Sequence, residues 1–135
     1  MSNTPVLTIC IPTYNRCQEL ENLLLSIVRQ IDETKFHRIE IAVSDNASTD
    51  DTDQMISSLK NKYPNIRLEY YRNSSNLGAD MNYLKAVEIA HGEYAWLMGS
   101  DDELNDQAIE KALFSIESKD TIYICGRDTF LGNFN

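Results

Sequence analysis

Short apolar runs rich in β-branched residues alternate along the chain with longer stretches whose apolar residues recur at helical spacing. The expected strands are residues 6–11, 39–44, 66–71, 94–98 and 121–125. The expected helices are marked by apolar residues within 20–31, 55–59, 79–90 and 109–116. Strands that alternate with helices of about 10–15 residues predict βαβ units. We therefore expect an α/β fold with a mainly parallel sheet and helices on both of its faces.

The residues that punctuate this pattern predict where individual elements end. The chain has 135 residues, a length that suits one ordinary domain, so we treat 1–135 as a single unit. We expect Pro12 to end the first strand and Thr49 or Asp50 to cap the second helix. Gly92 is expected to close the third helix at its C-terminal end.

Charge and cysteine usage narrow the classes of partner and compartment. The chain carries 21 acidic and 12 basic side chains, a net charge of −9, and its basic residues do not cluster. This disfavours nucleic-acid partners and docking on anionic lipid. No apolar run approaches the ~20 residues of a membrane span, and the N-terminus carries no secretion signal. The three cysteines show no CxxC spacing, and we expect Cys10 and Cys125 to pack as small hydrophobic residues. We expect a cytoplasmic protein.

Several familiar catalytic sequence motifs are absent from this sequence. With five glycines, neither GxGxxG nor GxxxxGK[ST] occurs, which disfavours a dinucleotide-binding Rossmann enzyme and a P-loop NTPase. The two histidines, His37 and His91, stand apart at element boundaries and are expected at the surface. They provide neither a His/Cys metal cage nor a Ser-His-Asp set.

Polar side chains gather where the first, second and fourth expected strands end. Because the carboxyl ends of parallel strands meet at one edge of the sheet, these side chains are expected to share a crevice in which ligands bind. The residues are Thr13, Tyr14 and Asn15 after the first strand, Asp45 and Asn46 after the second, and Ser100, Asp101 and Asp102 after the fourth.

The chemistry of these residues suits a nucleotide and a divalent cation, although each also has a structural interpretation. Asp101 and Asp102 provide hard oxygens for Mg²⁺ or Mn²⁺, with diphosphate oxygens and water completing the shell; alternatively they favour the positive end of the next helix. Asp45 and Asn46 have the donors and acceptors that can read a base edge, or they form an Asx turn. Tyr14 stacks on a base or ribose, or covers the core.

Three stretches occur in order: 6–16 (VLTICIPTYNR), 41–52 (IAVSDNASTDDT) and 92–102 (GEYAWLMGSDD). Together they resemble the N-terminal half of glycosyltransferase family 2, the inverting GT-A enzymes that use nucleotide-diphospho-sugars. The resemblance runs from about residue 5 to residue 125. It implies a GT-A, Rossmann-like sheet that is truncated in this chain.

The resemblance also implies roles for individual residues. The stretch Pro12, Thr13, Tyr14 and Asn15 would line the nucleotide pocket, and Asp45 and Asn46 would contact the base and ribose. Asn76 and Gly78 would close over the nucleotide and sugar, and Ser100 would contribute to the same site. Asp101 and Asp102 match the end of the metal-binding Asp-x-Asp motif, with Asp102 as the metal ligand and Asp101 on the ribose or diphosphate. Gly99 stands where that motif has its first Asp, which leaves fewer carboxylates for the metal.

The implied activity is transfer of a sugar, with inversion, from a nucleotide-diphospho-sugar to the hydroxyl of a carbohydrate or lipid-linked acceptor. The product would be a surface polysaccharide or glycolipid, and the intact enzyme would work in the cytoplasm or at the inner face of the membrane. The resemblance places the catalytic base beyond Asn135, so this chain would bind nucleotide without transferring sugar. An unpaired strand edge then predicts self-association.

Two other functions remain as alternatives. One is a non-catalytic nucleotide-binding or interaction module on the same sheet. The other is a nucleotidyltransferase, which is disfavoured because such enzymes carry a glycine-rich loop after the first strand, where this chain has residues 12–16 without a glycine.

Overall fold

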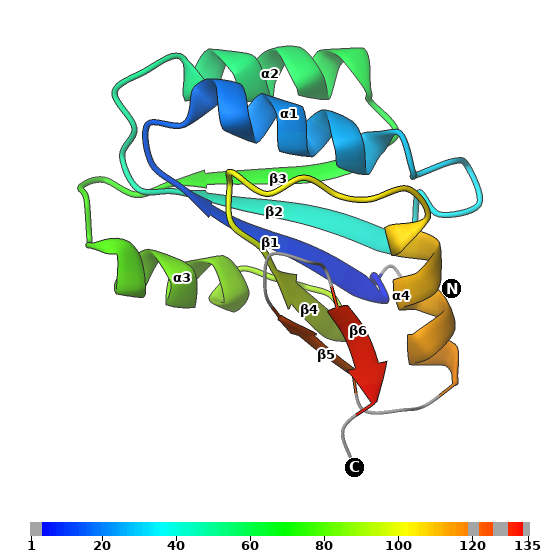
Figure 1. Ribbon diagram of the computed structural model, residues 1–135. Helices are drawn as coiled ribbons and strands as arrows, with labels where there is room; N and C mark the ends of the chain where they lie inside the picture. Colours follow the sequence, from blue (N-terminus) through cyan, green and yellow to red (C-terminus); the bar gives the residue numbers. More distant parts are fainter. Residues whose placement is uncertain (1–3, 119–121, 126–129, 134–135) are drawn as a thin grey trace.

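The computed structural model describes residues 4–118, 122–125 and 130–133 (Figure 1). The strands are β1 Leu7–Thr13, β2 Ile39–Asp45, β3 Arg67–Arg72, β4 Tyr94–Leu97, β5 Ile122–Cys125 and β6 Phe130–Asn133. The helices are α1 Cys17–Val28, α2 Thr52–Lys62, α3 Ala79–Glu88 and α4 Ala108–Glu117. The expected alternation of strands and helices is confirmed through α4.

A four-stranded parallel sheet in the order β3-β2-β1-β4 forms the centre of the fold. Helices α1 and α2 lie on one face of the sheet, and α3 lies on the other (Figure 1). The register pairs Thr13 with Asp45 and Asp45 with Arg72, so three strands end side by side. This register creates the crevice edge that the sequence predicts.

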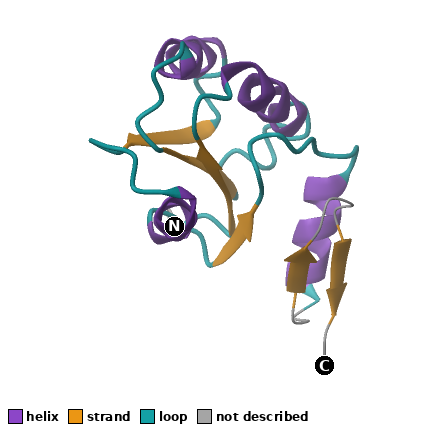
Figure 2. Ribbon diagram, turned by 60° about the vertical axis from the view of Figure 1, so that its left-hand side comes forward, coloured by secondary structure: helices purple, strands orange, loops and turns teal. Residues whose placement is uncertain are grey.

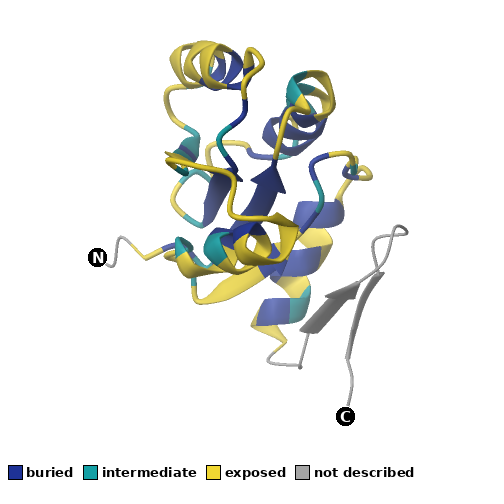
Figure 3. Ribbon diagram, turned by 90° about the vertical axis from the view of Figure 1, so that its left-hand side faces the viewer, coloured by how far each residue is buried: buried dark blue, intermediate teal, exposed yellow. Residues whose placement is uncertain are grey.

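The apolar pattern of the sequence explains this layering. Every residue of β1 and β2 is buried, as expected for central strands covered on both faces (Figure 3). Helix α1 buries one apolar stripe, which consists of Leu20, Leu23, Leu24, Ile27 and Val28. The start of α4 and the loop before it are held near the C-terminal end of α1: the Ile109 N–H donates to Gln30 Oε1 at 3.1 Å, and the Leu104 N–H donates to Ser26 Oγ at 3.1 Å.

The expected fifth strand does not extend the parallel sheet. Strand β5 pairs antiparallel with β6 in a separate two-stranded sheet (Figure 2). The physical reason is the short connection between them, since two parallel strands need a crossover of about a dozen residues or more. Strand β6 was not expected from the sequence, and Thr121 lies outside the described residues.

Two expected helix boundaries are wrong. Helix α3 ends at Glu88, so Gly92 does not close it. Instead the Gly92 N–H donates to Thr8 Oγ1 at 2.8 Å, and a Cβ at this position would lie 2.8 Å from the Thr8 backbone nitrogen. At the start of α2, Asp51 occupies the N-cap position without a side-chain cap, while Asp50 accepts from the Thr52 N–H at 3.1 Å.

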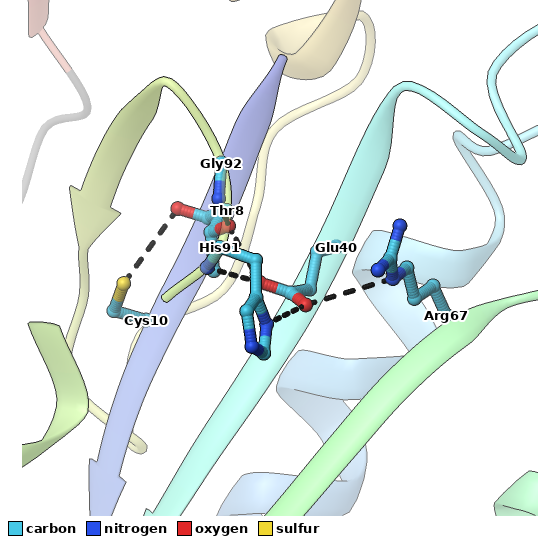
Figure 4. Close-up of polar contacts among 6 residues, drawn as sticks. All are labelled: Thr8, Cys10, Glu40, Arg67, His91 and Gly92. Atoms are coloured by element: carbon cyan, nitrogen blue, oxygen red, sulfur yellow. Dashed lines mark hydrogen bonds and ion pairs between the residues drawn. The ribbon is translucent and has the colours of Figure 1, made fainter. Parts of the chain in front are cut away.

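The cysteines and histidines follow expectation in part. Cys10 is fully buried, and burial, followed by the Glu40 charge, raises the pKa of its thiol to about 12, which makes it unreactive. The side chain of Cys125 lies outside the described residues. His37 is exposed as expected. The His91 side chain is 53% exposed, yet its ring contacts the buried Glu40 (Figure 4). No helix in the described part of the chain is both long and apolar enough to span a bilayer.

Candidate functional site

A cavity of about 580 Å³ is lined by residues at the carboxyl ends of β1 and β2; the arrowheads in Figure 1 mark these strand ends. This volume falls in the usual range for small-molecule sites. Its walls come from the β1–α1 loop, the end of β2, the loop before α3, the start of α3 and the turn after β4. The lining residues are Pro12, Thr13, Tyr14, Arg16, Asn46, Asn76, Gly78, Ala79, Asn82, Tyr83, Gly99, Ser100 and Asp101.

The structure brings together most, but not all, of the residues that the sequence singled out. Pro12, Thr13, Tyr14, Asn46, Asn76, Gly78, Ser100 and Asp101 all line the cavity. Asn15, Asp45 and Asp102 do not appear in its lining. Each of these three instead makes hydrogen bonds that shape the neighbouring backbone.

Thr13 ends β1 and places a buried hydroxyl beside the cavity. Thr13 is 3% exposed, and its Oγ1 is the one buried side-chain polar atom in the described residues that has no hydrogen-bond partner. A buried hydroxyl without a partner costs free energy, so native structures seldom leave one unpaired. Because Thr13 lines the cavity, a ligand there could complete its hydrogen bonding.

Asp45 is fully buried, and the protein occupies both of its carboxylate oxygens. Oδ1 accepts from the Ser48 N–H at 3.0 Å and from the Ser48 hydroxyl at 2.5 Å. Oδ2 accepts from the Tyr70 hydroxyl, and burial together with this bond raises the pKa of Tyr70. The geometry therefore favours the local-turn interpretation of Asp45 over direct contact with a base.

Asn15 joins the two loops that follow β1 and β2. Its backbone is left-handed, with φ of 50°, and its N–H donates to Ser48 Oγ at 2.9 Å. Its side-chain oxygen accepts from the Thr49 N–H at 2.7 Å and from the Asp50 N–H at 3.3 Å. Asn15 thereby fixes the loop that carries Tyr14 to the edge of the cavity.

Sequence reasoning missed five lining residues: Arg16, Ala79, Asn82, Tyr83 and Gly99. Arg16 is exposed and is the only lysine or arginine among the lining residues, so it supplies positive charge in a chain of net charge −9. A signal for Asn82 was present. It shares a helix face with Ala86 at i, i+4, and both are buried.

Asp101 and Asp102, which follow β4, have their carboxylates close to Gly99. The Gly99 N–H donates to Asp102 Oδ2 at 2.9 Å, and a Cβ at Gly99 would meet Asp101 Oδ1 at 3.1 Å and Asp102 Oδ2 at 3.4 Å. Asp101 faces the cavity. Helix α4 begins only at Ala108, so neither aspartate lies in its first turn.

These carboxylates fit a divalent cation only with help from a ligand. No group of three or more His, Cys, Asp or Glu side chains in the described residues could hold a metal. Mg²⁺ is commonly held by one or two carboxylates together with substrate phosphates and water. The donor set at Asp101 and Asp102 therefore suits a metal that arrives with a diphosphate.

Comparison with known proteins finds relatives over most of this chain. The family model described as glycosyl transferase family 2 matches residues 8–135. Abequosyltransferase RfbV of Salmonella typhimurium is 46% identical over 123 residues, which cover 90% of this chain and 36% of the relative. A Campylobacter jejuni GalNAc(5)-diNAcBac-PP-undecaprenol beta-1,3-glucosyltransferase is 33% identical over 106 residues, covering 78% of this chain and 32% of the relative.

Solved structures show the same architecture. S. aureus TarS 1–349 in complex with UDP-GlcNAc has a TM-score of 0.71 at 27% identity, covering 84% of this chain and 31% of that one. A Pyrobaculum calidifontis mannosyltransferase, solved with GDP-Man and Mn²⁺, has a TM-score of 0.77 at 22% identity, covering 91% and 36%. The parallel sheet and its flanking helices thus have the GT-A fold. The chain spans about a third of the length of these relatives, and it belongs to glycosyltransferase family 2.

Proposed function

We propose that this chain forms the donor-binding part of a sugar transferase, with residues 1–135 as one nucleotide-sugar-binding unit. The donor is a nucleotide-diphospho-sugar, and the sugar passes with inversion to the hydroxyl of a carbohydrate or lipid-linked acceptor. A surface polysaccharide or glycolipid is the proposed product, made in the cytoplasm or at the inner face of the membrane. The names of the abequosyltransferase and the undecaprenol-linked glucosyltransferase support this assignment.

The observation that carries the proposal is the unpartnered Thr13 hydroxyl, buried on a cavity that also presents Arg16 and Asp101. The Thr13 hydroxyl donates to or accepts from the nucleotide, and Tyr14, which is 44% exposed at the edge, stacks on its base. Arg16 attracts the diphosphate, because its guanidinium matches phosphate geometry. The UDP and UDP-GlcNAc complexes of TarS support a nucleotide sugar as ligand.

Asp101 and Asp102 would hold the Mg²⁺ or Mn²⁺ that accompanies the diphosphate, and the ion would supply positive charge to the leaving group. Asp101, which lines the cavity, orients the ribose or diphosphate. Neither carboxylate is assigned as the catalytic base, and Asp45 is committed to Ser48 and Tyr70. We place the base, which removes the proton from the acceptor hydroxyl, in the part of the domain that follows Asn135 in the family.

The test is calorimetric titration of the chain with UDP, CDP, GDP and dTDP, each with and without Mn²⁺. We expect one nucleotide to bind in a Mn²⁺-dependent manner. Thr13→Val should weaken it about tenfold because one hydrogen bond is lost. Asp101→Asn should reduce the dependence on Mn²⁺. Thr34→Val serves as the matched control, since Thr34 bonds Asp32 in an exposed loop away from the cavity. Failure of the unsubstituted chain to bind any of the four nucleotides would contradict the proposal.

A further inference from the structure

Four asparagine side chains link the loop before α3 to the ends of β1 and β2. We call Asn46, Asn73, Asn76 and Asn82 the amide relay. Asn46 and Asn82 are each only 3% exposed and both line the cavity. Each amide carries an acceptor oxygen and a donor NH₂ group, and buried amides need partners for both.

Asn82 reaches from α3 to the carboxyl ends of two strands. Its Nδ2 donates to the Ser44 carbonyl at 3.0 Å and to the Thr13 carbonyl at 3.4 Å. Its Oδ1 accepts from the Ser44 hydroxyl at 2.8 Å and from Asn73 Nδ2 at 3.1 Å. One side chain therefore fixes the backbone of Thr13, the residue with the unpartnered hydroxyl, relative to β2 and to the loop before α3.

Asn46 extends the relay into the loop before α3, and both its side-chain oxygen and its NH₂ group form hydrogen bonds there. Its Oδ1 accepts from the Leu77 N–H at 2.8 Å and from Asn73 Nδ2 at 3.1 Å. Its Nδ2 donates to Asn76 Oδ1 at 2.8 Å and to the Gly78 carbonyl at 3.4 Å. Asn76 Oδ1 also accepts from the Gly78 N–H at 2.8 Å. An aspartate at position 46 would keep the acceptor contacts and lose both donor contacts.

We propose that Asn82 and Asn46 are positioning residues that hold the 73–78 loop and Thr13 in the binding arrangement before the nucleotide arrives. A preformed wall spares the ligand the entropy of ordering the loop, which strengthens binding. The arrangement of the loop is a property of the free chain, whereas its effect on affinity rests on the proposed function. A purely structural role would instead stabilise the whole fold without a special effect on the loop.

Hydrogen exchange of the ligand-free chain separates these two roles. The variants are Asn46→Asp and Asn82→Asp, with Asn61→Asp as the matched control, because Asn61 is exposed on α2 and the control adds the same charge. We expect the amide of Gly78 to exchange about tenfold faster in both relay variants, while amides within β1 and β2 keep their protection. In Asn46→Asp the new carboxylate repels Asn76 Oδ1, which accepts from the Gly78 N–H, and in Asn82→Asp it repels the carbonyls of Ser44 and Thr13. Equal acceleration throughout the sheet, or no change at Gly78 relative to Asn61→Asp, would overturn the proposal.

Nucleotide affinity provides the second readout, measured with whichever of UDP, CDP, GDP and dTDP binds the unsubstituted chain. Kd should rise about tenfold in Asn46→Asp and Asn82→Asp, and stay within about twofold in Asn61→Asp. A loosened loop with unchanged Kd would overturn the claim that the relay assists binding. If the unsubstituted chain binds none of the four, the proposed function fails, and the exchange experiment alone decides whether the relay holds the loop.

Asn76→Ala keeps the test decisive if a buried charge prevents folding. Asn76 is exposed, so its truncation leaves the core intact, yet it removes the acceptor used by Asn46 Nδ2 and by the Gly78 N–H. Faster exchange of the Gly78 amide with an unchanged thermal unfolding midpoint is the expected result. Unchanged exchange at Gly78 would count against the relay.

Discussion

The Thr8 hydroxyl donates a 2.8 Å hydrogen bond to Oε1 of Glu40, and the two residues are paired across β1 and β2 (Figure 4). The Glu40 carboxylate is fully buried, at the opposite end of the sheet from the cavity. It also accepts from the His91 N–H at 2.9 Å and from His91 Nδ1 at 2.8 Å, while Arg67 Nε of β3 lies 3.6 Å away. One carboxylate thus joins β1, β2, β3 and the segment that leads into β4.

The Glu40 contacts predict a pH-dependent contribution to stability. Burial alone would raise the pKa of Glu40, but the bonds from the His91 N–H, the Thr8 hydroxyl and the His91 ring outweigh it and leave the pKa below its ordinary value of 4.5. Such a carboxylate stabilises the fold at pH values above 4.5, and this contribution disappears as the pH falls through the lowered pKa.

Glu40→Gln should therefore lower the free energy of unfolding by about 3 kcal/mol near neutral pH, because buried donors lose a charged acceptor. Urea titrations across the acid range should show the two proteins converging as the pH falls. Glu33→Gln is the control, since Glu33 is exposed in the α1–β2 loop. Parallel stability curves for Glu40→Gln and the unsubstituted chain would contradict this account.

Gly92 is required because the chain passes unusually close to β1. A Cβ on Gly92 would lie 2.6 Å from Thr8 Oγ1 and 2.8 Å from the Thr8 nitrogen, and the backbone atom cannot move aside as a side chain can. Gly92→Ala should destabilise the fold by about 1–3 kcal/mol. Thermal unfolding should show a lower midpoint than for Ser57→Ala, a substitution on the exposed face of α2. An unchanged midpoint in Gly92→Ala would show that β4 can shift at little cost.

The sequence was sufficient to place the site at the sheet edge because βαβ units make the strands parallel, and the carboxyl ends of parallel strands lie at the same edge. The boundaries differ slightly from those expected: β1 continues through Pro12, which was expected to end it, because that residue still pairs with Ser44 in the parallel sheet. Thr13 and Asp45, expected just after their strands, are the last residues of β1 and β2. What each side chain does there depends on contacts between segments distant in sequence, and local patterns carry no such information. Asp45 is one example, since Tyr70, twenty-five residues later, occupies its second oxygen.

Asn82 and Glu40 illustrate the same limit. Each is a polar residue within an otherwise ordinary helix or strand, and only the packed fold shows which distant partners it bonds. The pairing of β5 was missed for a different reason: a four-residue apolar run has no feature that distinguishes a parallel from an antiparallel partner.

Asp50 should stabilise two helices at once. Its Oδ2 accepts from the Cys17 N–H at 3.1 Å and its Oδ1 from the Thr52 N–H at 3.1 Å, so one carboxylate serves the first residues of α1 and α2. Burial, the largest single influence, opposes its ionisation, but the Thr52 hydroxyl and these backbone bonds together outweigh it and leave its pKa lowered. Asp50→Ala should cost about 1–2 kcal/mol, and the unfolding free energy measures it. Asp53→Ala, in the first turn of α2, should cost less, because Asp53 contributes only through the helix dipole. Equal losses would refute this dual role of Asp50.

The outward faces of α3 and β4 predict self-association of this chain. Leu84 is 64% exposed and Met81 54% on α3, and Tyr94 and Leu97 are each 40% exposed on opposite faces of β4, which ends the sheet order of the described strands. Exposed apolar residues near an unpaired strand edge favour association. Sedimentation velocity should show the mass average rising with concentration, and Leu84→Lys should reduce it. Phe114→Lys is the control, since Phe114 is 70% exposed on α4. A single monomeric species at all concentrations would contradict the prediction. An equal effect of Phe114→Lys would show that association is not centred on α3.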